Sequence, residues 1–378
     1  MVACCRFAHY RIGILMIIKE IISAIEEYAP LSLQESWDNA GVQVGGIDAE
    51  ATGALLCVDV TECIVDEAVA KGANLVISHH PLLFKGLKRI VGATPVERIV
   101  AKALRNGITI YSAHTNMDST VGGVSWRDAE KLGLKNVHVL APQSGQVMKL
   151  VTFVPVAHVD AVSEAMWQAG AGQIGNYDRC AYRMTGTGTY RPVDGANSFA
   201  GHIGEQHEEA EVRVEVVFPV AITGRVVSAM LAAHPYEEPA YDLFKLENKQ
   251  PTGLGIVGEI EQPVKAADFI AHVKHVLNIA SVPCSGNLDA TVKKVALCGG
   301  AGGEFIPDAI RSGADIYMCG DLKYHDFTSY NDRIVIANIG HYESEECTKG
   351  IFYDIIKKKF PNFATYYAEL EKNPISFL

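Results

Sequence analysis

Short, continuously apolar segments alternate with helical patterns in the first and last parts of the chain. Strands that are apolar throughout and separated by helices indicate a mostly parallel sheet with both faces covered. We predict strands at 54–60, 75–78, 108–112, 294–298, 315–319 and 333–338, and helices at 17–28, 64–71, 96–105, 305–312 and through Ile351, Ile355 and Ile356. We therefore expect one discontinuous α/β main domain, built from residues 16–139 and 251–378.

The residues between these two parts follow a different pattern. Strands are predicted at 150–154, 182–190, 212–218 and 241–246, with helices at 159–168 and 221–233. The segment Val151-Thr-Phe-Val-Pro155 is echoed by Val216-Val-Phe-Pro219, and each precedes a helix. The order β-α-β-β-α-β is ferredoxin-like. We expect an inserted α+β domain at 140–250, with an irregular loop at 191–204, which is rich in glycine, proline, asparagine and serine.

Composition narrows the class of protein. The chain has 378 residues, of which 48% are hydrophobic, so it is long and apolar enough for two folded domains. Its formal net charge of −11 argues against a general nucleic-acid binder, and it lacks an apolar run of roughly 18 residues that would suit a membrane span. Nine scattered cysteines without a C-x-x-C pair fit a reducing cytoplasm. We expect residues 1–15 to be an extension outside the fold.

Metal-binding side chains follow three of the predicted strands. His79 and His80 come directly after 75–78, Asp118 follows 108–112, and His341 and Glu345 follow 333–338. Ligands of open α/β sheets bind at the carboxyl ends of strands, and neutral imidazole is the commonest protein metal ligand. Turn residues and helix caps would explain the acidic residues equally well if each segment stood alone. Taken together, the three segments predict a metal site.

The spacing of these residues favours two ions over one. Successive side chains of an extended chain point to opposite faces, so His79 and His80 fit one ligand for each of two neighbouring ions. A carboxylate such as Asp118 can bridge two cations. His341 and Glu345 are four residues apart and would share one face of a helix. Nitrogen and oxygen ligands without thiolate suit Zn, Mn, Fe, Co or Ni.

Weaker candidates surround this set. We expect His114 and Asp59 to orient the ligands from outside, and His325 or Asp321 to act as catalytic proton shuttles. The glycine-rich segment 298–303 follows a strand and is better explained by a tight turn than by a phosphate-binding loop. Residues 37–39, Trp-Asp-Asn, fit a substrate wall and a plain turn equally well. The segment 234–239 suits a helix-ending loop or an interface.

Five motifs together resemble the GTP cyclohydrolase 1 type 2 homologue family, also known as proteins like NGG-interacting factor three. They are Ser36-Trp-Asp-Asn-Ala-Gly, Ser78-His-His-Pro-Leu-Leu-Phe, His114-Thr-Asn-Met-Asp118, Gly320-Asp-Leu-Lys-Tyr-His-Asp and Gly340-His-Tyr-Glu-Ser-Glu345. The resemblance covers the chain from about residue 16 onward. It implies two divalent metal ions per subunit, held by His79, His80, Asp118, His341 and Glu345. It also implies a toroidal homohexamer and a CutA/PII-like insert of the longer members.

Two functions are compatible with these features. The first is a metal-dependent hydrolase in which two cations activate a bridging water, with a nucleotide or phosphoester among the possible small-molecule substrates. The second is a non-enzymatic, metal-binding regulatory or chaperone-like oligomer, whose PII-like insert senses a ligand or partner. Neither function involves a membrane, and the acidic balance disfavours nucleic acid as a partner.

Overall fold

The computed structural model describes residues 16–377, so the extension expected at 1–15 lies outside the described residues. Contacts divide the chain into two units. The main unit contains the residues up to Val137 together with those from Gly255 onward, and the insert unit is His138–Leu254. Within 16–377, no helix combines the length and the apolar character that a membrane span requires.

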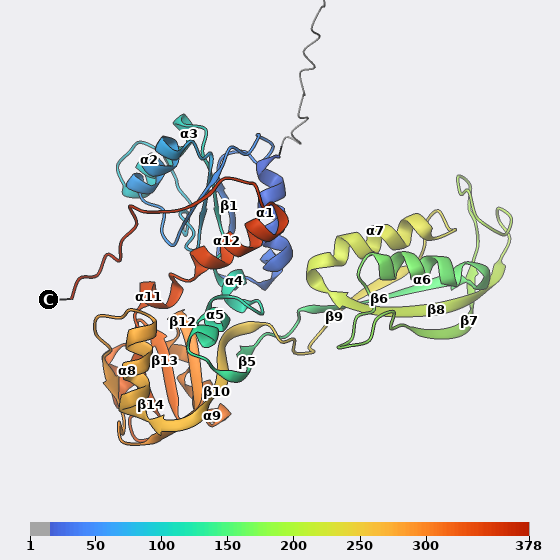
Figure 1. The fold of residues 1–378 in the computed structure, drawn as a ribbon. Coiled ribbons are helices and arrows are strands. Elements are labelled where there is room, and N and C mark those ends of the chain that lie inside the picture. Colours follow the sequence, from blue (N-terminus) through green and yellow to red (C-terminus); the bar gives the residue numbers. More distant parts are fainter. Residues whose placement is uncertain (1–15, 378) are drawn as a thin grey trace, which may run out of the picture. The chain divides into compact units, whose positions relative to one another are not determined.

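The first sheet of the main unit has five strands in the order β1-β4-β3-β2-β15. Strands β15, β2, β3 and β4 run parallel, and β1 is antiparallel to β4. Helices α1 and α12 lie on one face of this sheet and α2 and α3 on the other (Figure 1). Alternate side chains of the buried strands pack against the helices on each face. The bounds are α1 Ile18–Tyr28, β1 Gly41–Val44, β2 Ala54–Cys57, α2 Glu62–Lys71, β3 Leu75–Ser78, α3 Pro95–Arg105, β4 Thr109–Ser112, α4 Thr115–Ser119, α12 Thr348–Lys359 and β15 Thr365–Tyr367.

The second sheet of the main unit has six strands in the order β11-β14-β13-β12-β10-β5. Strands β12, β13 and β14 are parallel, whereas β11 and β10 pair antiparallel with their neighbours. Helices α5 and α8 pack their apolar faces into this core. The bounds are α5 Val124–Lys131, β5 Lys135–Pro142, β10 Gly253–Lys265, α8 Ala266–Val276, β11 Cys284–Ser285, β12 Thr291–Ala301, α9 Ile306–Ser312, β13 Ile316–Gly320, α10 Tyr324–Tyr330, β14 Val335–Asn338 and α11 His341–Glu345.

The α/β class and the six apolar strands agree with the prediction, but the expectation of one mostly parallel sheet is wrong. Each group of three predicted strands is flanked by strands that the apolar pattern did not reveal. Strands β1 and β15 flank β2, β3 and β4, whereas β10 and β11 flank β12, β13 and β14. The flanking strands form hydrogen bonds with the outer strands of each group. The two groups therefore do not pair with each other, and they form separate sheets.

The insert unit has the order β-α-β-β-α-β that the sequence pattern indicated. Its four strands pair antiparallel in the order β7-β8-β6-β9. Helices α6 and α7 cover one face of this sheet (Figure 1) and bury a core that includes Val162, Met166, Val214, Val226 and Met230. The bounds are β6 Val147–Pro155, α6 Val159–Gln168, β7 Tyr182–Tyr190, β8 His207–Pro219, α7 Thr223–Ala233 and β9 Tyr241–Leu246.

Candidate metal centre

The polar residues that follow β3, β4 and β14 meet at one place in the main unit. His79 and His80 directly follow β3, Asp118 lies in the short helix α4 that follows β4, and α11 begins at His341 and ends at Glu345. Both sheets therefore contribute side chains. The five residues predicted as metal ligands come from segments up to 266 positions apart in the sequence, yet they form one cluster.

Glu345 lies at the centre of the cluster. Its Oε2 is 2.9 Å from His80 Nε2 and 3.1 Å from His341 Nε2, and these two nitrogens are 3.2 Å apart. Its Oε1 is 3.5 Å from His79 Nε2, which is 3.7 Å from Asp118 Oδ1. The carboxylate thus faces His80 and His341 with one oxygen and His79 with the other. This arrangement resembles two half-sites that share one carboxylate.

The second nitrogen of each imidazole is hydrogen-bonded away from the cluster. The acceptors of the four Nδ1 atoms are Ala113 O for His79 at 3.0 Å, Asp59 Oδ1 for His80 at 2.9 Å, Asp38 Oδ1 for His114 at 2.8 Å and Asp321 Oδ2 for His341 at 2.7 Å. An Nδ1–H that donates to oxygen leaves the Nε2 lone pair free to ligate. Each ring is therefore held in the tautomer and orientation of a metal ligand.

The carboxylates of the centre, on Asp38, Asp59, Asp118, Asp321 and Glu345, form ion pairs only with imidazoles among the described residues. Neither lysine nor arginine takes part in these pairs. His79 Nε2 and Asp118 Oδ1 are buried without a hydrogen-bond partner. Buried, unpartnered polar atoms are costly. A donor set of this kind fits divalent cations.

The pKa values at the centre reflect these imidazole–carboxylate pairs. Burial lowers the pKa of His80, but its hydrogen bonds to Asp59 and Glu345 outweigh that effect and raise the pKa to about 10. The pKa of His341 rises to about 9, because its bonds to Glu345 and Asp321 outweigh burial. Burial and the charge of Glu345 raise the pKa of Asp118. The pKa of each of these two imidazoles is thus raised by Glu345, the carboxylate that both of them contact.

Backbone geometry explains the glycine-rich segment 298–303. It continues strand β12 as far as Ala301, so the expected tight turn is wrong for its first half. A Cβ at Gly300 would collide with Glu345 Oε1, and φ there is +65°. The amides of Gly299 and Gly300 already donate to Ser125 Oγ and Ser344 Oγ. The segment therefore permits the close approach of Glu345 and does not offer these amides to a phosphate.

Comparison with known proteins identifies the same family as the sequence motifs do. Residues 16–374 match the family model described as Duf34/NIF3 (NGG1p interacting factor 3). The chain belongs to this family. It is 37% identical over 364 residues to a Halalkalibacterium halodurans protein named GTP cyclohydrolase 1 type 2 homolog, covering 95% of this chain and 98% of that protein. The Bacillus subtilis protein of the same name is 36% identical over 369 residues, covering 95% and 98%.

A solved structure of the DUF34/NIF3 family has the same fold. It is the Bacillus cereus protein related to NIF3, with a TM-score of 0.83 and 37% sequence identity, and the match covers 97% of this chain and 100% of that one. The family resemblance stated from the motifs is thereby confirmed. Because coverage of both chains is nearly complete, the insert is part of the shared architecture.

The residues that were predicted to orient the ligands or to shuttle protons differ in how close they lie to the metal centre of this DUF34/NIF3 member. Asp59 contacts His80, as expected. His114 is closer to the centre than expected, because one of its ring nitrogens lies within 4.8 Å of ligand nitrogens of both His79 and His80. Asp321 is bound to His341, which is an orienting position. His325 is exposed on α10 and makes no hydrogen bond or ion pair with the cluster in the described structure, so its expected catalytic role has no geometric support.

Sequence reasoning missed the role of Asp38. Its carboxylate accepts from His114 Nδ1 and from both the amide and the hydroxyl of Thr115. Burial opposes ionisation of Asp38, but these hydrogen bonds prevail and lower its pKa to about 2. The only signal in the sequence was its position inside the motif Ser36-Trp-Asp-Asn. Its partners are 76 and 77 residues away, so local pattern does not connect them.

An aromatic surface borders the centre. The exposed fraction is 58% for the Trp37 side chain and 50% for Phe84, and their ring centroids are 5.9 Å apart. Both rings also lie edge-on to His114, with centroid distances of 6.1 and 6.4 Å. Residues 36 and 37 lie in a turn, and the Trp37 ring lies beside His114, so the turn is confirmed and the substrate wall stays a prediction.

Proposed function

We propose that this protein is a metal-dependent hydrolase with a dinuclear centre. His79, His80, Asp118, His341 and Glu345 are the proposed ligands of two divalent cations, of the Zn, Mn, Fe, Co or Ni type. The observation that carries the proposal is the convergence of buried, unpartnered His79 Nε2 and Asp118 Oδ1 on the carboxylate of Glu345. Neither atom has a hydrogen-bond partner in the described part of the chain, and bound cations would accept the lone pairs of both.

The distances support two half-sites. His79, Asp118 and Oε1 of Glu345 form one group, whereas His80, His341 and Oε2 of Glu345 form the other. His114 lies near both histidines that follow β3 and is a further ligand candidate. When bound, two cations lower the pKa of water and stabilise negative charge on the attacked group. The protein's own part is to hold the imidazoles rigidly through Asp59, Asp38 and Asp321.

The aromatic surface beside the centre suggests the substrate class. Trp37 and Phe84 present exposed rings next to His114, and a flat base stacks well on such rings. A nucleotide or another aromatic phosphoester would place its base there and its reacting group near the ligands. The relatives are named GTP cyclohydrolase 1 type 2 homolog, and GTP is therefore one member of the panel to be tested.

The test combines metal analysis with hydrolysis. Purified protein, loaded separately with each candidate metal, is assayed on GTP and a panel of aromatic and aliphatic phosphoesters. The variant Asp118→Ala removes a proposed ligand, and Asp48→Ala alters an exposed aspartate of the same unit as a control. We expect turnover in wild type and the control, and at least a hundredfold less in Asp118→Ala. Equal turnover in all three proteins would refute the catalytic proposal.

A second candidate function is supported by the insert unit. Its β-α-β-β-α-β order is the basis for proposing a CutA/PII-like regulatory domain in a homohexamer that binds metal without turnover. Light scattering with and without a chelator would measure the assembly. A hexamer that binds metal stably, together with no hydrolysis of any substrate in the panel, would favour this function over the hydrolase.

A further inference from the structure

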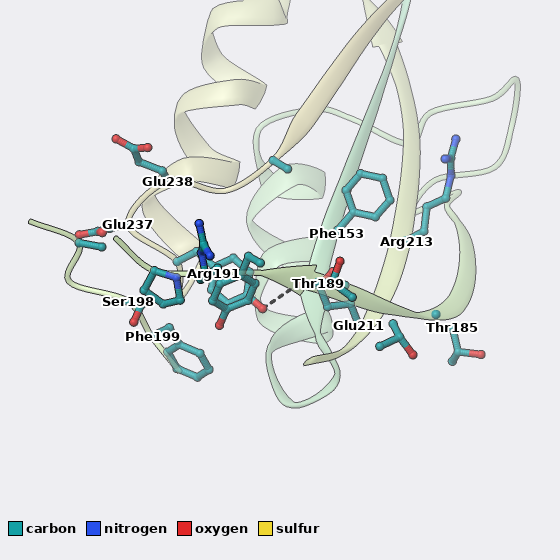
Figure 2. Close-up of a pocket in the computed structure, with 18 of the residues that line it drawn as sticks. Phe153, Thr185, Thr189, Arg191, Ser198, Phe199, Glu211, Arg213, Glu237 and Glu238 are labelled. Carbon is teal, nitrogen blue, oxygen red and sulfur yellow. Dashed lines mark hydrogen bonds between the residues drawn. The ribbon is translucent and has the colours of Figure 1, made fainter. Parts of the chain in front are cut away.

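The insert unit contains a cavity of about 640 Å³ that is lined only by residues of the insert. Figure 2 shows it on the sheet, with Glu211, Arg213 and Thr185 on the strands and Arg191, Ser198 and Phe199 on the loop that follows β7. Val212 and Val214 of β8 belong to the core under the helices. Because side chains alternate along a strand, Glu211 and Arg213 face the opposite, uncovered side. Most small-molecule sites have volumes in this range.

Two glycines of β7 create the hollow. Gly186 pairs with Glu211 and Gly188 pairs with Glu209 in the antiparallel register, so both occupy the same face as Glu211. A Cβ at Gly188 would collide with the Glu211 carboxylate, whereas a Cβ at Gly186 would meet nothing within 4 Å. Glycine inside a strand weakens the strand and often marks the close approach of a ligand. The Thr/Gly alternation of residues 185–189 thus shapes this cavity, which is separate from the metal centre.

A buried carboxylate without a cation forms the floor. The Glu211 side chain is only 8% exposed, and its Oε1 accepts a hydrogen bond from Tyr236 Oη at 2.7 Å. Burial and the Glu211 carboxylate raise the pKa of Tyr236, so the phenol stays protonated as a donor. Among residues 16–377, Tyr236 is the only hydrogen-bond donor to this carboxylate. By contrast, Glu215 on the same face is neutralised by Lys149 and Arg213, each at 2.8 Å.

Aromatic rings form the walls. The ring centroid of Tyr236 is 5.9 Å from that of Tyr190 and 5.8 Å from that of Phe199. Phe199 is 49% exposed. Flat rings next to a carboxylate suit a flat ligand with N–H donors along one edge. Arg191 lines the same cavity and makes no ion pair in the described part of the chain, so it is available for an anionic substituent of the ligand.

We propose that this cavity binds a flat heterocycle with two adjacent N–H donors and an anionic substituent, of the guanine or pterin kind. A ring N–H and an exocyclic amino N–H can donate side by side to the two oxygens of one carboxylate, as a guanidinium does. Adenine is the same size but presents a ring acceptor beside its amino group, and that acceptor would face the negative charge of Glu211. This site is independent of the proposed hydrolase function, because none of its lining residues belongs to the metal centre.

The test measures binding to the full chain by isothermal titration calorimetry. The probes are guanosine monophosphate and a pterin carboxylate, with adenosine monophosphate and spermidine as comparators. We expect guanosine monophosphate and the pterin carboxylate to bind at least about tenfold more tightly than adenosine monophosphate. The reason is that the buried Glu211 carboxylate accepts hydrogen bonds from the N–H groups of guanine or pterin, whereas adenine presents an acceptor there. No binding of the guanine and pterin probes, equal binding of the two nucleotides, or tighter binding of spermidine would overturn the proposal.

Variants locate the site. Glu211→Gln removes the charge and one acceptor and is expected to weaken guanine or pterin binding by at least about tenfold. Glu215→Gln is the matched control on the same strand and face. Gly186→Leu fills the open space without a backbone conflict, and it is expected to abolish binding while circular dichroism shows a wild-type melting curve. Asp118→Ala should bind the probes normally. Loss of binding in Asp118→Ala but not in Glu211→Gln would show that the probes bind at the metal centre, and it would refute the insert site.

Discussion

Two buried glutamates in this protein occupy similar depths but very different surroundings. Glu345 in the main unit is 3% exposed and lies among the Nε2 atoms of three histidines. Glu211 in the insert is 8% exposed and receives one phenolic hydrogen bond. Lone-pair donors around a carboxylate fit metal cations, whereas aromatic rings around a carboxylate fit an organic ligand with N–H groups. The neighbours, and not the acid itself, therefore determine what each site can bind.

The largest expected effect tests this comparison directly. Glu345→Gln should remove the shared carboxylate and reduce metal affinity by about a thousandfold or more, because both half-sites lose a charged ligand. Glu211→Gln should leave metal content unchanged. Elemental analysis after dialysis against a weak chelator measures both, with Glu346→Gln as a control on the adjacent, exposed residue. Equal metal content in Glu345→Gln and wild type would contradict the assignment of Glu345.

A second prediction concerns the support of the metal centre. Glu371 Oε1 accepts the amides of Val58 and Asp59, and its Oε2 is 3.0 Å from Lys349 Nζ, an ion pair whose two side chains are 4% and 8% exposed. Glu371→Ala would leave the buried Lys349 ammonium with only the exposed Glu346 as an ion-pair partner among the residues that the structure describes, and the amides of Val58 and Asp59 without their acceptor. It should lower the free energy of unfolding of the main unit by about 3 kcal/mol. Chemical denaturation measures this loss. Glu369→Ala removes an exposed acid nearby and should cost much less. The insert cavity should retain its ligand binding in Glu371→Ala.

A smaller effect is expected for the residue that orients His80. Asp59→Ala removes the acceptor of His80 Nδ1 and should weaken metal binding by about 10- to 100-fold, without abolishing it. Competition with a fluorescent chelator gives the affinity. Asp66→Ala is a suitable comparison, because this aspartate pairs with Lys102 at the surface and does not contact the cluster. Unchanged affinity in Asp59→Ala would show that the hydrogen bond is not needed to orient the ligand.

The smallest expected effect concerns the aromatic surface. Trp37→Ala should raise KM for an aromatic phosphoester by about tenfold, because stacking on one ring is worth about 1–1.5 kcal/mol, and should leave kcat nearly unchanged. Hydrolysis of an aliphatic phosphoester, which cannot stack, is the internal control. A fall in kcat with unchanged KM would place Trp37 in the chemical step and not in substrate binding.

The pattern along the chain predicted the apolar strands of the main unit and the order of the elements in the insert. Buried strands such as β3 and β13 are continuously apolar, and the polar residues after β3 and β14 are the ones that meet in the cluster. Their positions are encoded locally, because a strand that is buried on both faces ends where polar side chains begin. The helix that places His341 and Glu345 on one face was likewise expected from their spacing.

The sequence alone therefore determined the six apolar strands of the main unit, the order of the insert and the chemical identity of the candidate ligands. Only the tertiary structure decided that the parallel strands divide between two sheets and that Asp38 holds His114. It also decided that Gly188 makes room for the Glu211 carboxylate and that Gly186 leaves open space beside it. The physical reason is the distance along the chain. Periodicity and spacing report on neighbours within a few residues, whereas His80 and His341 meet across 261 residues through packing that no local pattern specifies.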